Sequence, residues 1–333
     1  MADADNFQGA DTTVTSDTKH VTAWQNEPMY QLTLLAATRR RIVLLVVGGL
    51  AIVGVGVWAG SWRLPVGAAA GKNLSAPASL PPARISDAFR VATWNIHSGR
   101  GRDGIVDLER VARRIDGYDF IGLNEVRAVC TWSGPDQAEK LGRSVNCAWL
   151  FLPYDHRWGR DDFGNAALSA FPVADWLRLP LPHSRPKGHG NMTLFRLNVA
   201  GSPVQIIVTH IDHRFDTTSQ LQAVSSLFLG LSEPAILMGD LNVSDDDPRL
   251  GELLGTRGVL DALAAAPEKP PAGRIDWILV RGLECKSGGV VDHGESDHPL
   301  VWAELRLPAP ASSDGATGLP SAVVEGQGQA ATR

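Results

Sequence analysis

The sequence has little cysteine and no excess of positive charge. Three cysteines in 333 residues are too few for a small disulfide-stapled scaffold, and a net charge of −5 gives no indication of a surface built to bind a polyanion. The 34 glycines have no period and no heptad repeat is sustained, which excludes a collagen and a coiled coil. With 44% hydrophobic and 20% charged residues, the composition is typical of a chain that buries a core. At roughly 150 residues per domain, its length allows about two domains.

A long uncharged stretch lies near the N-terminus. Residues 42–62 (IVLLVVGGLAIVGVGVWAGSW) carry no charge, and about 20 apolar residues suffice for a helix to cross a hydrocarbon core of ~30 Å. We predict a single transmembrane helix with Trp58 and Trp62 near its far interface. Because arginines occupy positions 39–41 and a lone Arg63 follows the stretch, the positive-inside rule predicts a cytoplasmic N-terminus and an extracytoplasmic remainder. A cleaved signal peptide is the alternative, and the length of the run disfavours it.

Composition also divides the rest of the chain. Residues 1–41, mostly polar before the arginines, are predicted to be a flexible cytoplasmic tail. Of the 26 positions from 63 to 88, 16 are Ala, Gly, Pro or Ser, which predicts a flexible linker. Residues 308–333 have no aromatic residue and no isoleucine, and we predict a disordered tail. One domain, residues 89–307, remains.

Short apolar segments bounded by turn residues recur in this domain. Strand patterns fall at residues 90–97, 120–126, 166–170, 193–199, 204–210, 235–241, 275–281 and 299–306. Helical spacing of apolar residues occurs at 106–115, 135–143 and 219–229. Because several strands follow one another without a helix, we predict an α/β sandwich of mixed sheets covered by helices rather than an all-parallel doubly wound sheet.

Polar groups stand at the ends of these strands. They are Asn95, Glu125, His210, Asp240, Asn242, Asp276 and the adjacent pair Asp297 and His298. Asp240 and Asn242, at i and i+2, share one strand face, and Asp276 within RIDWIL would be costly to bury without a partner such as His298. Taken singly, each has a structural alternative as a turn residue, a solvated strand end or a buried pair. Together they predict one shared site.

The residue types at these positions favour a metal-assisted reaction. Glu125, Asn95 and Asp297 offer oxygen atoms, which suit a hard cation such as Mg²⁺ or Mn²⁺ and imply a phosphate substrate. The sequence has no Cys cluster, HExxH, GxSxG or Walker loop. Attack by an activated water is therefore the simplest mechanism.

Seven motifs occur in the order and approximate spacing of the endonuclease/exonuclease/phosphatase superfamily, the deoxyribonuclease I-like fold, which the chain resembles over nearly all of residues 89–307. They are TWNIH (93–97), GLNEV (122–126), GNAALSAFP (164–172), THID (209–212), GDLN (239–242), RIDWI (274–278) and SDHP (296–299). The resemblance implies a four-layer α/β/β/α sandwich, in which two mixed sheets pack face to face with helices outside. It also implies a metal-dependent hydrolase acting on phosphoester bonds.

The resemblance further implies a role for each motif residue. Glu125 is similar to the principal metal ligand, Asn95 contributes to the metal and phosphate site, and Asp297 completes it. The residues implied in catalysis are Asp240 and Asn242, which orient and deprotonate the attacking water, and His210 and His298, which donate hydrogen bonds to the phosphoryl oxygens, with Asp276 holding His298.

Four further residues are candidates for substrate binding. Asn165 lies in the GNAALSAFP motif, His97 shares a strand face with Asn95, and Arg100 and Arg102 lie in the glycine-rich loop SGRGRDG. A rim or core histidine and an ordinary turn with solvated arginines are the alternatives.

The sequence also departs from the family pattern. Many relatives have Gln in place of Asn124 and Arg in place of Ala170, and many have an Arg near 188–193, where this sequence reads GHGNMT. Arg185, Lys187 or His189 could supply the missing positive charge, or the phosphate pocket is weaker than usual.

Three functions remain at this point. The first is a membrane-tethered Mg²⁺-dependent phosphodiesterase or phosphatase acting outside the cytoplasm on a phospholipid head group, an inositol phosphate or a similar small ester. An extracytoplasmic nuclease is the second, although the charge of −5 gives it limited support. A noncatalytic binding domain that keeps the fold is the third. Cys130 and Cys147 either form a disulfide or remain free thiols, and Cys285 is left over.

Overall fold

The computed structural model describes residues 27–59, 63–78, 80, 86, 88–128, 134–157, 162–182, 189–214 and 216–308. They belong to two compact units, which meet in the sequence between Trp62 and Arg63. Residues 1–26 and 309–333, which belong to the predicted tails 1–41 and 308–333, lie outside the described residues.

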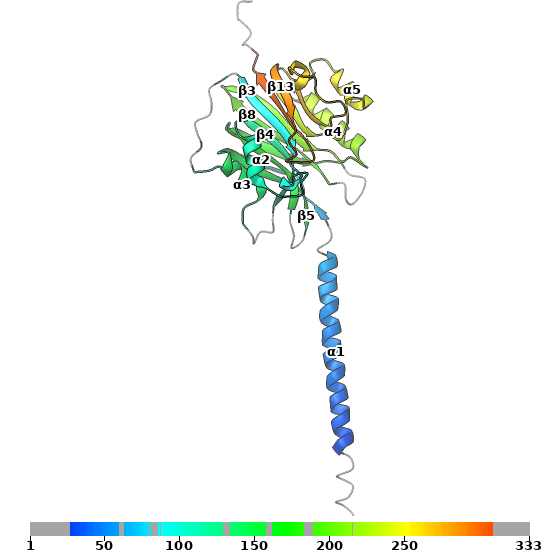
Figure 1. Cartoon of the computed structure of the whole chain (residues 1–333). Coiled ribbons are helices and arrows are strands. Elements are labelled where there is room, and N and C mark those ends of the chain that lie inside the picture. Colours follow the sequence, from blue (N-terminus) through cyan, green and yellow to red (C-terminus); the bar gives the residue numbers. More distant parts are fainter. Residues whose placement is uncertain are drawn as a thin grey trace, which may run out of the picture. The chain divides into compact units, whose positions relative to one another are not determined.

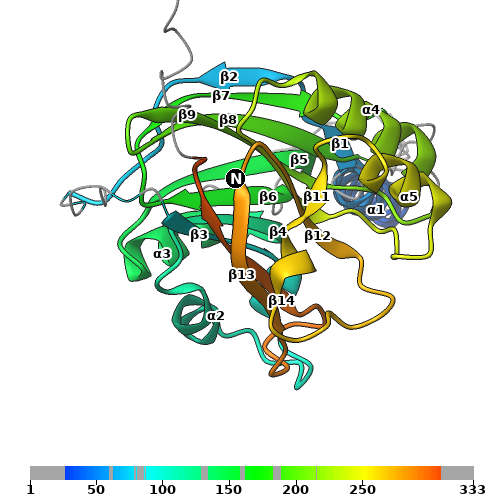
Figure 2. The same cartoon turned by 90° about the horizontal axis from the view of Figure 1, so that it is seen from above.

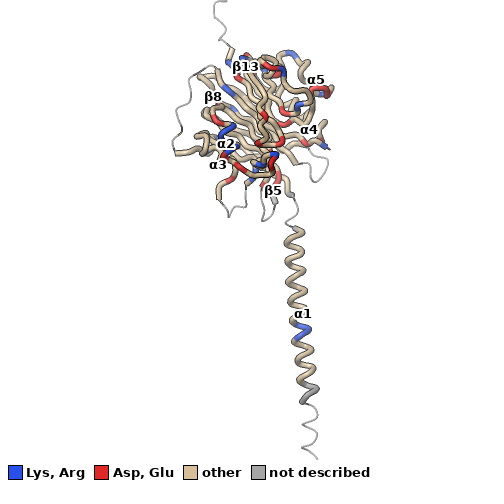
Figure 3. Tube along the Cα trace, viewed as in Figure 1, with Lys and Arg blue, Asp and Glu red and all other residues tan. Residues whose placement is uncertain are grey.

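The described residues of the N-terminal unit form helix α1 (Glu27–Ala59) (Figure 1). Its segment Gln31–Trp58 has a mean hydropathy of 2.2 and is long and apolar enough to cross a membrane. Lys and Arg form one band on it, the arginines at 39–41 (Figure 3). The helix begins before the predicted start at Ile42 because the preceding residues, rich in Leu, Ala and Arg, are good helix formers.

The second unit is built on two seven-stranded sheets. In spatial order, the first sheet contains β1 (Arg63–Pro65), β5 (Ala148–Arg157), β6 (Asp162–Ser169), β4 (Phe120–Ala128), β3 (Ala88–Asn95), β14 (Leu300–Arg306) and β13 (Glu284–Val291). The second contains β11 (Leu260–Asp261), β12 (Asp276–Arg281), β10 (Ala235–Asp240), β9 (Ser202–His210), β8 (Asn191–Val199), β7 (Val173–Pro180) and β2 (Ala69–Gly71). Each sheet has one parallel pair, β3 with β4 and β9 with β10, so both sheets are mixed.

Helices cover the outer faces of both sheets (Figure 2). They are α2 (Leu108–Ile115) and α3 (Gln137–Ser144) on the first sheet, and α4 (Thr217–Gly230) and α5 (Pro248–Leu254) on the second, with short 3₁₀ turns η1 (His97–Gly99) and η2 (Ala262–Ala265). Side chains alternate between layers: Ile206 and Val208 of β9 pack between the sheets, whereas Ile207 packs under the helices. The predicted four-layer α/β/β/α sandwich is confirmed.

Part of the predicted linker is folded. β1 pairs with β5, β2 pairs with β7, and Ser75 bridges to Trp149, so residues from 63 to 75 contribute to both sheets instead of forming a flexible spacer. Small residues suit this place because a Cβ at Gly71 would come within 2.6 Å of the Trp176 ring. The Ala- and Gly-rich composition thus reflects close packing at a sheet edge.

Several elements were not anticipated from the sequence. β5 and β7 each contain one proline, β13 contains Gly288 and Gly289, and α5 is short. A recognisable pattern did precede α5: Asp247 caps the helix by accepting from the backbone N–H of Arg249, and Pro248 occupies its first turn.

The structure describes Cys147 and Cys285. Cys147 is buried and carries a free thiol, whose pKa burial raises to about 11. Cys285 is also free, and Cys130 lies outside the described residues.

Candidate active site

The polar strand ends lie along one edge of the sandwich. Asn95 is the last residue of β3, and His210 and Asp240 are the last residues of the parallel strands β9 and β10. Asp240 stands in register with His210 on one side and with Asp276, the first residue of antiparallel β12, on the other. Three adjacent strands therefore present His210, Asp240 and Asp276 side by side.

Asn95 connects the two sheets at this edge. Its side-chain nitrogen donates to Glu125 Oε1 at 3.2 Å and to Asp240 Oδ2 at 3.2 Å, and its Oδ1 accepts from the backbone N–H of His97 at 3.1 Å. Asn95 is 1% exposed. Carboxylates from different sheets thus converge on one buried amide group.

Glu125 reaches this position through an irregularity in β4. The pairing with β6 shifts register between Leu123 and Val126, and Glu125 has a φ of 57°. Positive φ also occurs at His97 (46°) and Asn242 (49°) on the same edge. Such conformations cost on the order of 1–3 kcal/mol each and concentrate at functional sites, because the surrounding fold must hold them.

Asp240 is the centre of the second-sheet half of the site. Its Oδ1 accepts from the backbone N–H of Asn242 at 3.0 Å, and its Oδ2 lies 3.4 Å from His210 Nε2 and 3.8 Å from His298 Nε2. Asn242 donates its side-chain N–H to Ile211 O at 2.7 Å, so its direct contacts fix the loop and the carboxylate of Asp240. The Asp240 carboxylate is 1% exposed.

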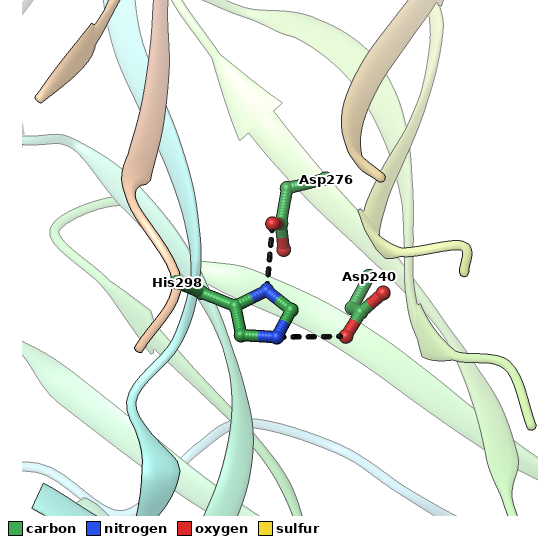
Figure 4. A group of neighbouring side chains, drawn as sticks. All are labelled: Asp240, Asp276 and His298. Carbon is green, nitrogen blue, oxygen red and sulfur yellow. Dashed lines mark hydrogen bonds and ion pairs between the residues drawn. The ribbon is translucent and has the colours of Figure 1, made fainter. Parts of the chain in front are cut away.

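His298 lies between two carboxylates (Figure 4). Its Nδ1 is 2.8 Å from Asp276 Oδ2, and the Asp276 carboxylate is 3% exposed. Burial acts to lower the pKa of His298, but the hydrogen bond to Asp276 and the charges of Asp276, Asp240 and Asp297 outweigh it and raise that pKa to about 9. Burial, assisted by the Asp240 charge, raises the pKa of Asp276 against the effect of the His298 hydrogen bond. The two carboxylates beside His298 therefore favour its protonated form.

The loop that carries Asp297 and His298 is held from several sides. Ser296 Oγ donates to Asn95 O at 2.7 Å, Trp94 Nε1 donates to His298 O at 2.9 Å, and Arg114 of α2 pairs with the buried Glu295 at 2.5 Å. These contacts tie the loop to β3 and to α2.

Replacing Arg114 by leucine is expected to lower kcat roughly tenfold to a hundredfold, because displacements near 1 Å of catalytic groups have effects of this size. Steady-state kinetics at saturating metal, with circular dichroism to monitor the fold, measures the change. Arg113→Leu, at the exposed neighbouring position, is the matched control. Equal kcat in the two variants would show that the Glu295 pair does not position His298.

A ladder of three buried asparagine amides underlies the site. Asn124 donates to Asn165 Oδ1 and to Thr209 O, both at 2.9 Å, and its Oδ1 accepts from the backbone N–H of Asp240 at 3.0 Å. Asn165 in turn donates to Asn191 Oδ1 at 3.0 Å, and Asn191 donates to a main-chain carbonyl of β5. Asn124 and Asn165 come from the first sheet and Asn191 from the second, so the ladder joins the sheets and sets the position of Asp240.

The structure brings together most residues predicted for the site. Contacts connect Glu125, Asn95, Asp240, Asn242, His210, His298 and Asp276 in one network. Asp297, with a side chain 54% exposed, lies beside His298 in sequence and 3.5 Å from His97 Nδ1. Asn165 is connected to the site through the asparagine ladder and does not line the solvent-exposed side of the site.

The two loop arginines make other contacts. Arg100 donates to Gly104 O at 2.6 Å within its own turn, and Arg102 pairs with Asp292 at 2.7 Å. Arg102 thereby holds the His298 loop, a structural role that the sequence did not indicate. Of the residues considered for the missing family arginine, Arg185 and Lys187 lie outside the described residues, and His189 is half-buried.

Sequence reasoning also missed Asn191, Arg114 and Glu295. Asn191 is a buried amide at the start of an apolar strand, a combination that signals a required partner. Finding that partner requires the sheet pairing.

An open pocket of about 330 Å³ gives access to Asp276 and His298. Asp297 and Asp292 also line it, together with the 271–275 segment.

Among the residues that the structure describes, two groups of side chains could hold a cation. Ligand atoms of Asp240, Asp276 and His298 lie within 4.8 Å of one another, but His298 Nδ1 and Asp276 already share a hydrogen bond. Glu125 and Asp240 converge on the Asn95 amide, and a divalent cation beside these oxygen donors would relieve the repulsion between the carboxylates. The donor chemistry of the Glu125 side therefore fits a hard divalent metal.

Comparisons with known proteins agree with this geometry. The profile of the Endonuclease/Exonuclease/phosphatase family matches residues 92–298, and the chain belongs to this family. Its members hydrolyse phosphoester bonds with a divalent metal, and the protein is an enzyme of that class. A search of curated proteins found no match.

Solved structures share the fold. An endonuclease/exonuclease/phosphatase from Beutenbergia cavernae is 25% identical, with a TM-score of 0.54 over 66% of this chain and 72% of that one. A mannosyl-6-phosphatase from Bacteroides thetaiotaomicron is 17% identical (TM-score 0.52, covering 65% and 99%). The human Nocturnin catalytic domain with a bound sulfate anion is also 17% identical (TM-score 0.50, covering 67% and 96%).

Proposed function

We propose that the protein is a membrane-anchored phosphodiesterase or phosphatase that hydrolyses a small phosphoester, such as a phospholipid head group or an inositol phosphate, by in-line attack of water. The observation that carries the proposal is the convergence of Glu125, Asn95 and Asp240, with His298 and Asp276 beside them. Helix α1 anchors the chain, and the arginines at 39–41 favour a cytoplasmic N-terminus with the catalytic domain on the opposite side of the membrane.

Glu125 would hold a divalent metal, Mg²⁺ or Mn²⁺, with Asn95 and Asp297 completing the site. Bound there, the ion supplies Lewis-acid stabilisation of the phosphoryl oxygens. The carboxylate oxygens of Glu125 and Asp297 match the preference of such ions.

Asp240 acts as the general base on the attacking water. The N–H groups of Asn95 and Asn242 hold its buried carboxylate in one orientation, which fixes the direction from which it can accept a proton. His210 and His298 face the same carboxylate and donate hydrogen bonds to the phosphoryl oxygens as negative charge develops.

The protonation of His298 links activity to pH. Because Nδ1–H of His298 is directed at Asp276, a hydrogen on Nε2 is available for substrate only in the cationic form. Activity should therefore fall as the pH rises through about 9.

In Asp276→Asn the raised pKa of His298 should return toward its ordinary value of 6.5, so the alkaline loss of activity moves to lower pH. The pH profile of kcat, together with NMR titration of His298 in metal-free protein, measures the shift. Asp162→Asn, which removes the carboxylate beside the exposed His156, is the control and should leave the profile in place. If the parent enzyme, Asp276→Asn and Asp162→Asn all lost activity over the same alkaline pH range, His298 would have no part in the reaction.

A substrate panel tests the proposed function. The full chain in detergent is assayed with phosphomonoesters, phosphodiesters, phospholipids and plasmid DNA, with Mg²⁺, Mn²⁺ or a chelator. We expect metal-dependent hydrolysis of a small ester or lipid that the chelator abolishes. Preferential cleavage of DNA would identify a nuclease instead, and inactivity on every ester would indicate a binding domain.

A further inference from the structure

The chain enters the catalytic unit at the edge that carries the site. β1 is antiparallel to β5, β5 to β6, and β6 to β4, so β5 runs in the same direction as β4 and β3. Arg63, the first residue of β1, stands opposite Arg157, the last residue of β5. The start of β1 therefore lies at the same end of the sheet as Asn95 and Glu125.

Few residues separate this point from the apolar helix. Residues 60–62 join Ala59 to Arg63, and a fully extended chain of that length spans at most about 14 Å. A flexible 26-residue linker would give a mean reach of roughly 28 Å instead. Because β1 and β2 belong to the sheets, residues 63–71 do not add to the length of the connection, which starts at the end of the sheet that carries the site.

Exposed aliphatic side chains occur at this same edge. Ile105 and Val106, 61% and 52% exposed, lie in the turn that follows β3, in which Arg100 bridges to Val106. Leu64 of β1 is 50% exposed. Single exposed aliphatics are ordinary, but these share the sheet end at which the anchor enters.

We propose that the substrate is a phosphoester head group of a lipid in the bilayer that holds the protein's own anchor. This rests on the proposed function and narrows its substrate class. In this proposal the site acts on lipid at the bilayer surface, where Ile105 and Val106 contact the head-group layer. In the reaction, the oxygen of water bonds to phosphorus, the P–O ester bond breaks, and the leaving alkoxide takes up a proton.

Moving the domain away from the bilayer tests this arrangement. A rigid helical spacer of four EAAAK repeats, about 30 Å long, is inserted between Trp62 and Arg63. Full chains are reconstituted in phosphatidylcholine vesicles containing phosphatidic acid and a phosphatidylinositol phosphate. The same spacer placed between Pro308 and Ala309 is the matched control, and p-nitrophenyl phosphate and bis-p-nitrophenyl phosphate report on the site itself.

We expect the N-terminal spacer to lower hydrolysis of vesicle lipid at least tenfold, with hydrolysis of the soluble esters unchanged, and the control spacer to leave both unchanged. Ile105→Asp should lower the ratio of lipid to soluble-ester turnover severalfold relative to Leu260→Asp. Leu260 is 51% exposed on β11, away from the site edge.

The outcomes separate the two proposals. Lipid hydrolysis that survives the N-terminal spacer, or turnover of soluble esters or DNA without turnover of lipid, overturns the inference and leaves the phosphoesterase intact. Absence of metal-dependent turnover on every substrate overturns the proposed function and the inference with it.

Discussion

Asp240→Asn is expected to lower kcat about a thousandfold at saturating metal, within the range contributed by a positioned general base. Asparagine has nearly the same shape, but its amide cannot take a proton from water at neutral pH. Because the Asp240 side chain is buried and held by Asn95 and Asn242, no water-filled space is opened. Kinetics on the best ester of the panel, with the thermal unfolding midpoint, measures the effect.

The control for this variant lies in the following loop. Asp246→Asn changes an exposed carboxylate in the acidic turn 245–247 and should leave kcat within twofold of the parent enzyme. If Asp240→Asn retained kcat within tenfold of the parent, another group would have to be the base.

Glu125→Gln is expected to weaken the apparent affinity for Mg²⁺ or Mn²⁺ by at least about a hundredfold, because the change removes the charge of a direct ligand rather than an outer-shell contact. The metal concentration that gives half-maximal activity, and metal binding measured by calorimetry, report this shift. Excess metal should restore part of the activity, which distinguishes a ligand from a base.

A matched carboxylate is available for comparison. Glu139 of α3 pairs with Arg143 on the helix surface, and Glu139→Gln should leave the metal dependence unchanged. If Glu125→Gln kept the metal requirement of the parent enzyme, the ion would have to bind at the group formed by Asp240, Asp276 and His298 instead.

The fold could be predicted from the sequence because its motifs close short apolar runs that are bounded by turn residues. β9 is an example: its apolar run ends at His210, and both the strand and the position of the histidine follow from local pattern. β13 could not be found in this way, since Gly288 and Gly289 interrupt its pattern. β1 could not be predicted because the conformation of this three-residue edge strand depends on its pairing with β5 and not on its own residues.

The site was predictable in its residue types and less so in its contacts. The partnership of Asp276 with His298 followed from the cost of burying a carboxylate, and the structure places them 2.8 Å apart. The pairing of Arg102 with Asp292 spans 190 positions, and local sequence carries no information about it. Long-range partners of exposed charges depend on how loops meet after folding.

The asparagine ladder has a consequence for recombining this scaffold with relatives. The side-chain amides of Asn124, Asn165 and Asn191 hydrogen-bond to one another in sequence. Replacing one sheet with that of a relative would therefore leave buried amide donors and acceptors of the other sheet without hydrogen-bond partners. Chimeras that cross between the halves should therefore fail unless all three positions travel together. For catalysis, the two sheets have to be exchanged together.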